Sequence, residues 1–403
     1  MVAGIGGFVY HGVAGRVLGP SLYGDVASLI AVYAVFTTPT LILILVLARY
    51  SATLIAAGTT DSVRYLVVRS TQLTILPSVL IVGVAWLLAP ATADFLHLHS
   101  SAPVVWLGLA VAMIWQVGIP RGILQGIQRF AALSTNLSAE IMVRVITLAL
   151  LLAAALSVTG ATIALFMGAF AAYAIGLFAL RHDLPNGGRP ASLRAMVGFS
   201  LTATAGTLGV LLLYNLDVIL AKHFLNQHAA GIYASLNKIA SIVYFSTLSV
   251  SQVLFPRVVE AVATKNHPGR LLGISAGIQA LLGAGALLVF AVVPGLIVRL
   301  LFGSSFADAN IYILATGVIG LALSLTNLLV QFFMAAHDRW FIPLLAAGVV
   351  MLGSAIVLYH ASVGEVVSGV LASMLAVLAV LTVRLILLLP RLQPSTAPGS
   401  LEK

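Results

Sequence analysis

The stretch VLGPSLYGDVASL, from Val17 to Leu29, decides how this chain is organised. A weaker copy of it, FLNQHAAGIYASL, returns at Phe224 to Leu236. Laid over each other, the two stretches place Gly24 on Gly231, 207 positions later, and the shared Ala-Ser-Leu triplets also coincide. One chain therefore carries the same local pattern twice.

The same offset extends beyond the motif without a gap. It places Thr40 on Thr247, Leu47 on Leu254 and Gln72 on Gln279. A chance match would not keep one register across helix, turn and helix. We interpret the pattern as an internal duplication with its joint near Arg181 to Arg194. The predicted units are residues 1–195, an N-terminal lobe with its linker, and residues 196–403, a C-terminal lobe with a short tail.

Composition sets the broad class. The chain has 403 residues, of which 61% are hydrophobic and 8% charged, and its mean hydropathy is +1.12. Soluble domains carry about 25% charged residues, so this chain has too few to cover a surface in water. It contains no cysteine, which excludes disulfides and thiolate metal sites. We expect a polytopic helical membrane protein.

Twelve apolar stretches are long enough, or nearly so, to cross a bilayer. A spanning helix needs about 20 residues, and only 15 residues precede Arg16, so the first span is short unless translation starts upstream. The predicted spans are 1–15, 24–48, 72–90, 103–119, 134–157, 160–180, 196–220, 229–255, 271–298, 309–332, 341–360 and 364–389.

The charges between these spans predict the orientation. Of the 20 Lys and Arg residues, 14 fall on one side of the predicted topology. Basic loops stay in the cytoplasm, so we expect a multi-pass membrane protein with both termini cytoplasmic. The 14 residues are Arg49, Arg64, Arg69, Arg121, Arg129, Arg181, Arg189, Arg194, Arg257, Lys265, Arg270, Arg339, Arg391 and Lys403.

An even number of spans in each half means that both halves enter the membrane in the same direction. Such repeats are related by an axis along the membrane normal, and transporters use them. The predicted fold is therefore an all-α transmembrane bundle of about 12 helices, in two six-helix lobes related by a pseudo-two-fold axis. The segment between Arg181 and Ser200 contains Pro185, Gly187, Gly188 and Pro190, which suits a joint between lobes.

The string RVLGPSLYG, from Arg16 to Gly24, resembles the signature that follows the first helix of polysaccharide-biosynthesis membrane proteins. These are the oligosaccharide-lipid flippases of the multidrug/oligosaccharidyl-lipid/polysaccharide exporter superfamily. Three more stretches agree in order: ILQGIQRF (Ile123 to Phe130), LDVILAKHFLNQHAAGIYA (Leu216 to Ala234) and RLLFGSSFADA (Arg299 to Ala309).

The resemblance implies a function. Proteins of this family move an undecaprenyl-phosphate-linked sugar, or a related glycolipid, from the inner to the outer leaflet by alternating access. The implied partners are a lipid-linked glycan, membrane lipid and proteins of a glycan-assembly pathway, and we expect a monomer.

The sequence holds few motifs of soluble chemistry. No lysine follows a glycine, so the chain has no P-loop for ATP, and HExxH and CxxC are also absent. We expect no enzyme activity, no cofactor and no metal, and a cation or the membrane potential as the driving force. Asp94, His97 and His99 form a polar connection rather than a metal site, because positions two apart do not share a helix face.

The net charge of +9 follows from the topology, so we expect no nucleic-acid partner. Four arginines nevertheless stand at cytoplasmic helix ends, where a pyrophosphate head group would first be met. The planar guanidinium binds phosphate oxygens in pairs, which makes these arginines candidates for substrate binding. They are Arg49, Arg121, Arg129 and Arg257.

Charges inside spans are a sharper signal, since each costs about 2.5–3.5 kcal/mol at mid-helix. Glu140 and Arg144 are four apart and can pair on one helix; Arg144 is also a candidate for substrate binding. Asp217 and Lys238 lie at similar depths on consecutive helices, so we expect them to meet, either as a structural pair or as a functional one. In the functional case Lys238 binds substrate phosphate and Asp217 couples an ion.

His11, in the first span, is expected to be a satisfied or water-facing histidine rather than a proton relay. Two rival functions remain open. A multidrug antiporter of the same superfamily would need acidic cavity residues, of which Asp217 is the main candidate. A non-transporting scaffold of a glycan-assembly complex would not need the intramembrane charges.

Overall fold

A computed structural model describes residues 2–56, 62–181, 197–263 and 268–392, and over these residues the chain is all-helical. The first half comprises α1 (Val2–Phe36), α2 (Thr38–Ala56), α3 (Ser62–Phe95), α4 (Ala102–Gly126), α5 (Phe130–Ala153) and α6 (Ser157–Leu180). The second half comprises α7 (Val197–Phe224), α8 (Gln227–Ala263), α9 (Pro268–Val292), α10 (Pro294–Leu301), the 3₁₀ helix η3 (Ser304–Tyr312), α11 (Ile313–Ala335), α12 (Phe341–Leu358) and α13 (Val363–Leu392).

Helix α1 is a hairpin of two arms. Gly19 has φ 68° and ψ 176°, a conformation that interrupts the helix, and Pro20 follows it. Nδ1 of His11 is hydrogen bonded to the hydroxyl of Tyr23 at 3.0 Å. Twelve residues along a straight helix would separate these groups by about 18 Å. The chain therefore reverses inside the motif that the sequence marks as duplicated.

The repeat offset applies to whole elements. The second arm of α1 and helix α2 together run from Pro20 to Ala56, with a bend at Thr37. An offset of 207 places Pro20 on Gln227, which is the first residue of α8. One long helical segment of each half thus begins at the same position of the repeat.

The structure supports twelve membrane crossings among the described residues. Ten helical segments are long and apolar enough to cross, and one of them, Gly4–Ala56, has 53 residues. Such a segment would measure about 80 Å if it were straight, so its break at Gly19 gives two crossings. Helix α8, with 37 residues, adds the twelfth.

One predicted span is shorter than expected. The span predicted at 271–298 ends as α9 at Val292, because Pro294 lacks the N–H that would continue the helix and instead begins α10. Helices α10 and η3 then lead to α11 without a further crossing.

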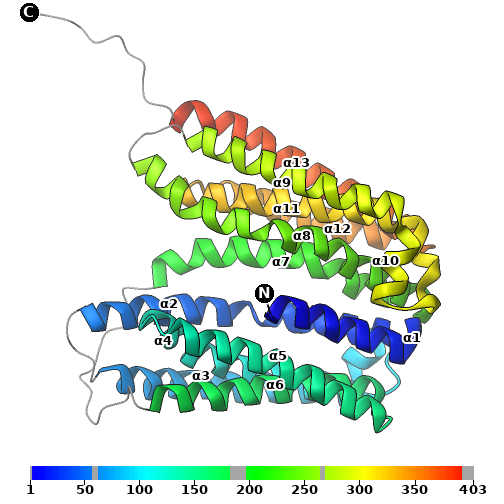
Figure 1. Ribbon diagram of the computed structural model, residues 1–403, viewed down its shortest axis with the longest axis horizontal. Coiled ribbons are helices and arrows are strands. Elements are labelled where there is room, and N and C mark those ends of the chain that lie inside the picture. The colour runs from blue at the N-terminus through cyan, green and yellow to red at the C-terminus, as the bar shows by residue number, and fades with distance from the viewer. Residues whose placement is uncertain (1, 57–61, 182–196, 264–267, 393–403) are drawn as a thin grey trace, which may run out of the picture.

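The helices form two lobes (Figure 1). Helices α1 to α6 lie in the lower half of the view and α7 to α13 in the upper half. The same pairs pack in each: α4 contacts α2, α3 and α6, and α11 contacts α8, α9 and α13. The predicted all-α fold of two six-helix lobes is confirmed. The expected joint at residues 182–196 lies outside the described residues.

The surface of the bundle is apolar. Large hydrophobic side chains such as Trp86, Leu87 and Leu281 are 68%, 70% and 75% exposed. An apolar surface of this kind is unfavourable in water. It is favourable in lipid, provided that every backbone group is hydrogen bonded within its helix. The chain is a multi-pass membrane protein.

The bundle has two ends. We call the end where α3, α5 and α7 finish the α10 end, on the right in Figure 1. The end where α2, α4, α6 and α8 finish is called the opposite end. The charge distribution predicts that the α10 end faces outward and the opposite end faces the cytoplasm, and this orientation stays a prediction.

Candidate functional site

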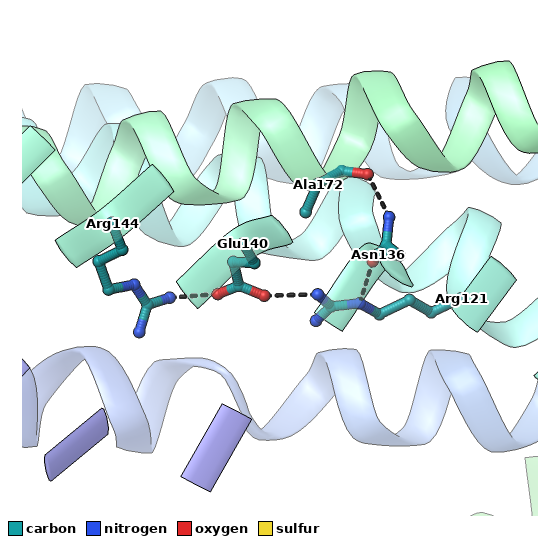
Figure 2. A network of polar contacts seen from close by, with 5 residues as sticks. All are labelled: Arg121, Asn136, Glu140, Arg144 and Ala172. Carbon is teal, nitrogen blue, oxygen red and sulfur yellow. Dashed lines mark hydrogen bonds and ion pairs between the residues drawn. The ribbon is translucent and has the colours of Figure 1, made fainter. Parts of the chain in front are cut away.

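A buried charge cluster lies in the first lobe (Figure 2). Arg121 of α4 donates from Nη2 to Glu140 of α5 at 2.5 Å and from Nε to Asn136 at 2.7 Å. Asn136 donates in turn to the carbonyl of Ala172 in α6, at 2.5 Å. Arg144 donates to the other carboxylate oxygen of Glu140. The predicted Glu140–Arg144 pair is confirmed, and the structure adds Arg121 to it.

The cluster is not neutral. Two guanidinium groups share one carboxylate, so it carries a net charge of one positive unit inside the membrane. Arg144 is its more accessible member, since its side chain is 17% exposed against 9% for Arg121. The Arg144 guanidinium lies 5.8 Å from the centre of the Tyr33 ring in α1. The excess charge therefore faces α1, the helix that packs on α7 and α8 of the other lobe.

The second lobe holds a buried carboxylate with uncharged partners. Asp217 is 2% exposed and accepts hydrogen bonds from the Tyr233 hydroxyl at 2.6 Å and the Asn237 amide at 3.1 Å. The backbone N–H of Val218 adds a bond of 2.9 Å. Three neutral donors hold this carboxylate, and no ammonium of the described residues contacts it.

The expected ion pair between Asp217 and Lys238 does not form. Lys238 donates to the Tyr214 hydroxyl at 3.2 Å, and its ammonium lies 5.0 Å from the centre of the Tyr214 ring. The side chain that faces Asp217 comes from the position before Lys238 on α8, which is Asn237. Similar depth in the membrane was the correct inference, but helix rotation decided which side chain faces the carboxylate.

Arg144 and Lys238 lie on two helices that both pack against α1, α5 in the first lobe and α8 in the second. His11 lies in the first arm of the same α1. His11 is itself bonded to Tyr23, so the expectation of a satisfied histidine is met. Two cations on either side of α1, each beside a tyrosine, form an arrangement that can bind an anion.

The other three predicted substrate residues lie elsewhere. Arg49 near the end of α2, Arg129 before α5 and Arg257 near the end of α8 are exposed at the opposite end of the bundle. Arg129 donates to the carbonyl of Ala179 at 3.4 Å. The structure does not bring these arginines to Arg144 and Lys238, and their role in substrate binding stays a prediction.

Sequence reasoning missed a buried ion pair that joins the two lobes. Lys222 of α7 lies 2.6 Å from Asp25 of α1, and both side chains are 2% exposed. The sequence placed Lys222 in a connection between spans, where it would be solvated. The feature of the sequence that could have indicated this pair is Asp25, an acidic residue directly after the RVLGPSLYG motif.

Two further sequence features form no site. His97 stacks on His223 with 5.5 Å between ring centres, and the described residues contain no group of three or more metal-ligating side chains. The string GISAG, Gly273–Gly277, spells the pattern of a hydrolase nucleophile elbow, but it lies within continuous helix α9. Such an elbow requires a strand-to-helix turn.

Comparisons with known proteins identify the family and the fold. The family model of polysaccharide biosynthesis proteins matches residues 1–262. The fold is similar to an inward-facing multidrug resistance MATE family transporter of the MOP superfamily, at 14% identity and a TM-score of 0.82 over 96% of this chain and 95% of that one. The outward-facing conformation of such a transporter matches with a TM-score of 0.66 at 13% identity, over 98% of this chain and 94% of that one.

A third structure is a MOP superfamily transporter from Pyrococcus furiosus, described as having a binding pocket of reverse polarity. It matches at 15% identity and a TM-score of 0.65, over 98% of this chain and 94% of that one. No curated protein matches the sequence. The family match covers more than half of the chain, so this protein belongs to the polysaccharide biosynthesis protein family, and its fold is that of MOP superfamily transporters.

Proposed function

We propose that this protein moves a lipid-linked oligosaccharide, or a related anionic glycolipid, across the bacterial inner membrane by alternating access. The observation that carries the proposal is the placement of two cations, Arg144 on α5 and Lys238 on α8, on helices of the two lobes that both pack against α1. Two cations at the lobe interface suit a phosphate or diphosphate head group, which both lobes would hold at once. The acyl chain would remain in the surrounding lipid.

The charge balance supports an anionic substrate. The Arg121–Glu140–Arg144 cluster carries one unmatched positive charge, and Lys238 adds another whose nearest described partner is a tyrosine. Burying unpaired cations costs free energy. A bound diphosphate would neutralise both positive charges and so offset that cost. The two cations are therefore explained by an anionic substrate.

Asp217 is the proposed coupling residue. Its carboxylate lies in the second lobe beside a cavity of about 10 Å³ that Asn237 and Tyr214 also line. That volume admits a proton, a small ion or about one water molecule, so we assign Asp217 to ion coupling. The unmatched positive charges of Arg144 and Lys238 favour an anionic glycolipid over the cationic substrates of a multidrug antiporter.

Binding of a polyprenyl diphosphate to the purified protein tests the proposal. The intact protein should bind farnesyl diphosphate and not farnesol. Arg144→Gln and Lys238→Gln should each weaken binding about tenfold to a hundredfold, the worth of a charge-assisted hydrogen bond. Arg270→Gln, which removes an exposed charge at the opposite end, serves as the matched control.

Equal binding by all three variants would refute the site. Normal glycan export in cells by Arg144→Gln together with Lys238→Gln, at matched protein level, would refute the transport role and favour the scaffold.

A further inference from the structure

We propose that Asp25 and Lys222 form a latch that holds the two lobes together at the α10 end and opens once in each transport cycle. The inference rests on the proposed alternating access, but it concerns residues outside the substrate site. Asp25 belongs to the second arm of α1 and Lys222 to the last turn of α7, so the pair joins one lobe to the other. Nothing in the sequence motif alone assigns this role.

The latch lies within a larger contact between the lobes. His223, the residue after Lys222, is hydrogen bonded to the carbonyl of Phe95 at 2.7 Å, and their rings stack at 4.1 Å. Tyr23 packs on Phe302 and Phe306, with ring centres 5.2 Å and 5.7 Å apart. These contacts all bridge the two lobes, and all lie at the α10 end. That end is closed in this structure.

Other ion pairs lie within a single lobe. Arg121, Glu140 and Arg144 belong to one lobe, and Arg384 pairs with Asp338 at 2.6 Å within the other. A rocking motion of the lobes as rigid bodies would leave those pairs intact. It would separate Asp25 from Lys222, because they stand on opposite sides of the boundary that opens.

Because the pair is buried, its contribution to stability depends on whether the α10 end is closed or open. With the α10 end closed, both side chains are 2% exposed, and each charge needs the other because no water reaches it. When the lobes part, water enters and can solvate both charges separately, so opening at this end is possible although it costs free energy. Removing one partner strands the other only in the closed state, and it therefore favours the open one.

Distances between spin labels across the two ends test the latch. The chain contains no cysteine, so label pairs can be introduced without background. One pair, Asp94→Cys with Ala361→Cys, reports on the α10 end, and a second, Ala56→Cys with Val259→Cys, reports on the opposite end; all four positions are exposed. Double electron–electron resonance in lipid nanodiscs then gives the populations without any substrate.

Asp25→Asn and Lys222→Gln should each raise the population with a long distance at the α10 end about tenfold or more relative to the closed one. The short-distance population at the opposite end should rise in parallel. The charge-reversed protein, Asp25→Lys with Lys222→Asp, should return toward the parent distribution. Arg384→Gln, which breaks an ion pair inside one lobe, is the control and should leave both distributions unchanged.

Unchanged distances in both single variants, or an equal shift in Arg384→Gln, would overturn the latch. The double variant Asp25→Asn with Lys222→Gln strands no charge, so it should keep a distribution near that of the parent and can be measured even if a single variant does not fold. A clear shift of the double variant toward the open distance at the α10 end would overturn the proposal. Failure of the proposed function is distinguishable: farnesyl diphosphate would not bind, whereas the label distances would still shift.

Discussion

Gly24 and Gly231, the two residues that the internal repeat superimposes, lie against each other where the lobes meet. A Cβ atom added to Gly24 would lie 3.0 Å from the backbone nitrogen of Gly231. Equivalent residues of two copies can touch only near the axis that relates the copies. The contact therefore marks the pseudo-two-fold axis. It also places both glycines at the same depth in the membrane, as a parallel repeat requires.

This close approach predicts that Gly231 cannot gain a side chain. A Cβ atom there would overlap the carbonyl oxygen of Pro20, which is backbone and cannot turn aside. We expect Gly231→Ala to lower the thermal unfolding temperature in detergent and to weaken closure at the α10 end. Gly277→Ala in α9 is the control, because a Cβ atom there meets nothing within 4 Å. That change should stabilise the helix by up to about 1 kcal/mol. Similar melting of both variants would contradict the close packing of the axis.

The charge cluster of the first lobe predicts an unequal response to neutralisation. Glu140→Gln leaves Arg121 and Arg144 without their shared carboxylate, and we expect it to destabilise the protein by about 3–5 kcal/mol. Arg144→Gln leaves Arg121 and Glu140 as a balanced pair, so it should cost far less. Thermal unfolding measures both, with Asp308→Asn as the control, since that carboxylate is 76% exposed. A larger loss of stability in Arg144→Gln than in Glu140→Gln would contradict the assignment of one excess positive charge to this cluster.

Asp217 and Lys238 should act independently, because they have separate partners. Lys238→Gln should weaken diphosphate binding, while Asp217→Asn should abolish the dependence of transport on an ion gradient and leave binding near normal. In a double-mutant cycle on thermal stability, the coupling between the two changes should stay below about 0.5 kcal/mol. Asp217→Asn with Lys238→Gln should still fold and yet lose transport. A coupling energy several times larger would contradict this independence and would indicate a direct ion pair between Asp217 and Lys238.

The predicted topology can be read by chemical labelling in intact cells. A cysteine placed at Ser100, in the connection after α3, should react with an impermeant maleimide, since that connection is expected to face outward. A cysteine placed at Asn186, in the predicted cytoplasmic linker, should react only after the cells are opened. Labelling in the reverse order would invert the orientation and move the latch to the cytoplasmic side.

The sequence by itself determined the class, the crossings and the repeat. Apolar runs of about 20 residues can only be membrane helices, and a constant offset can only arise from copied elements. It also determined the Glu140–Arg144 pair, because helix geometry alone brings residues four apart onto one face.

The tertiary structure decided every contact between helices. Arg121 joins Glu140 from another helix, Lys222 reaches Asp25 across the lobe boundary, and Asn237 takes the place that the sequence suggested for Lys238. A difference of one residue turns a side chain by about 100° around a helix of 3.6 residues per turn. Hydropathy sets the depth of a residue in the membrane, but not this rotation. Only the packing of the helices against one another determines which faces meet.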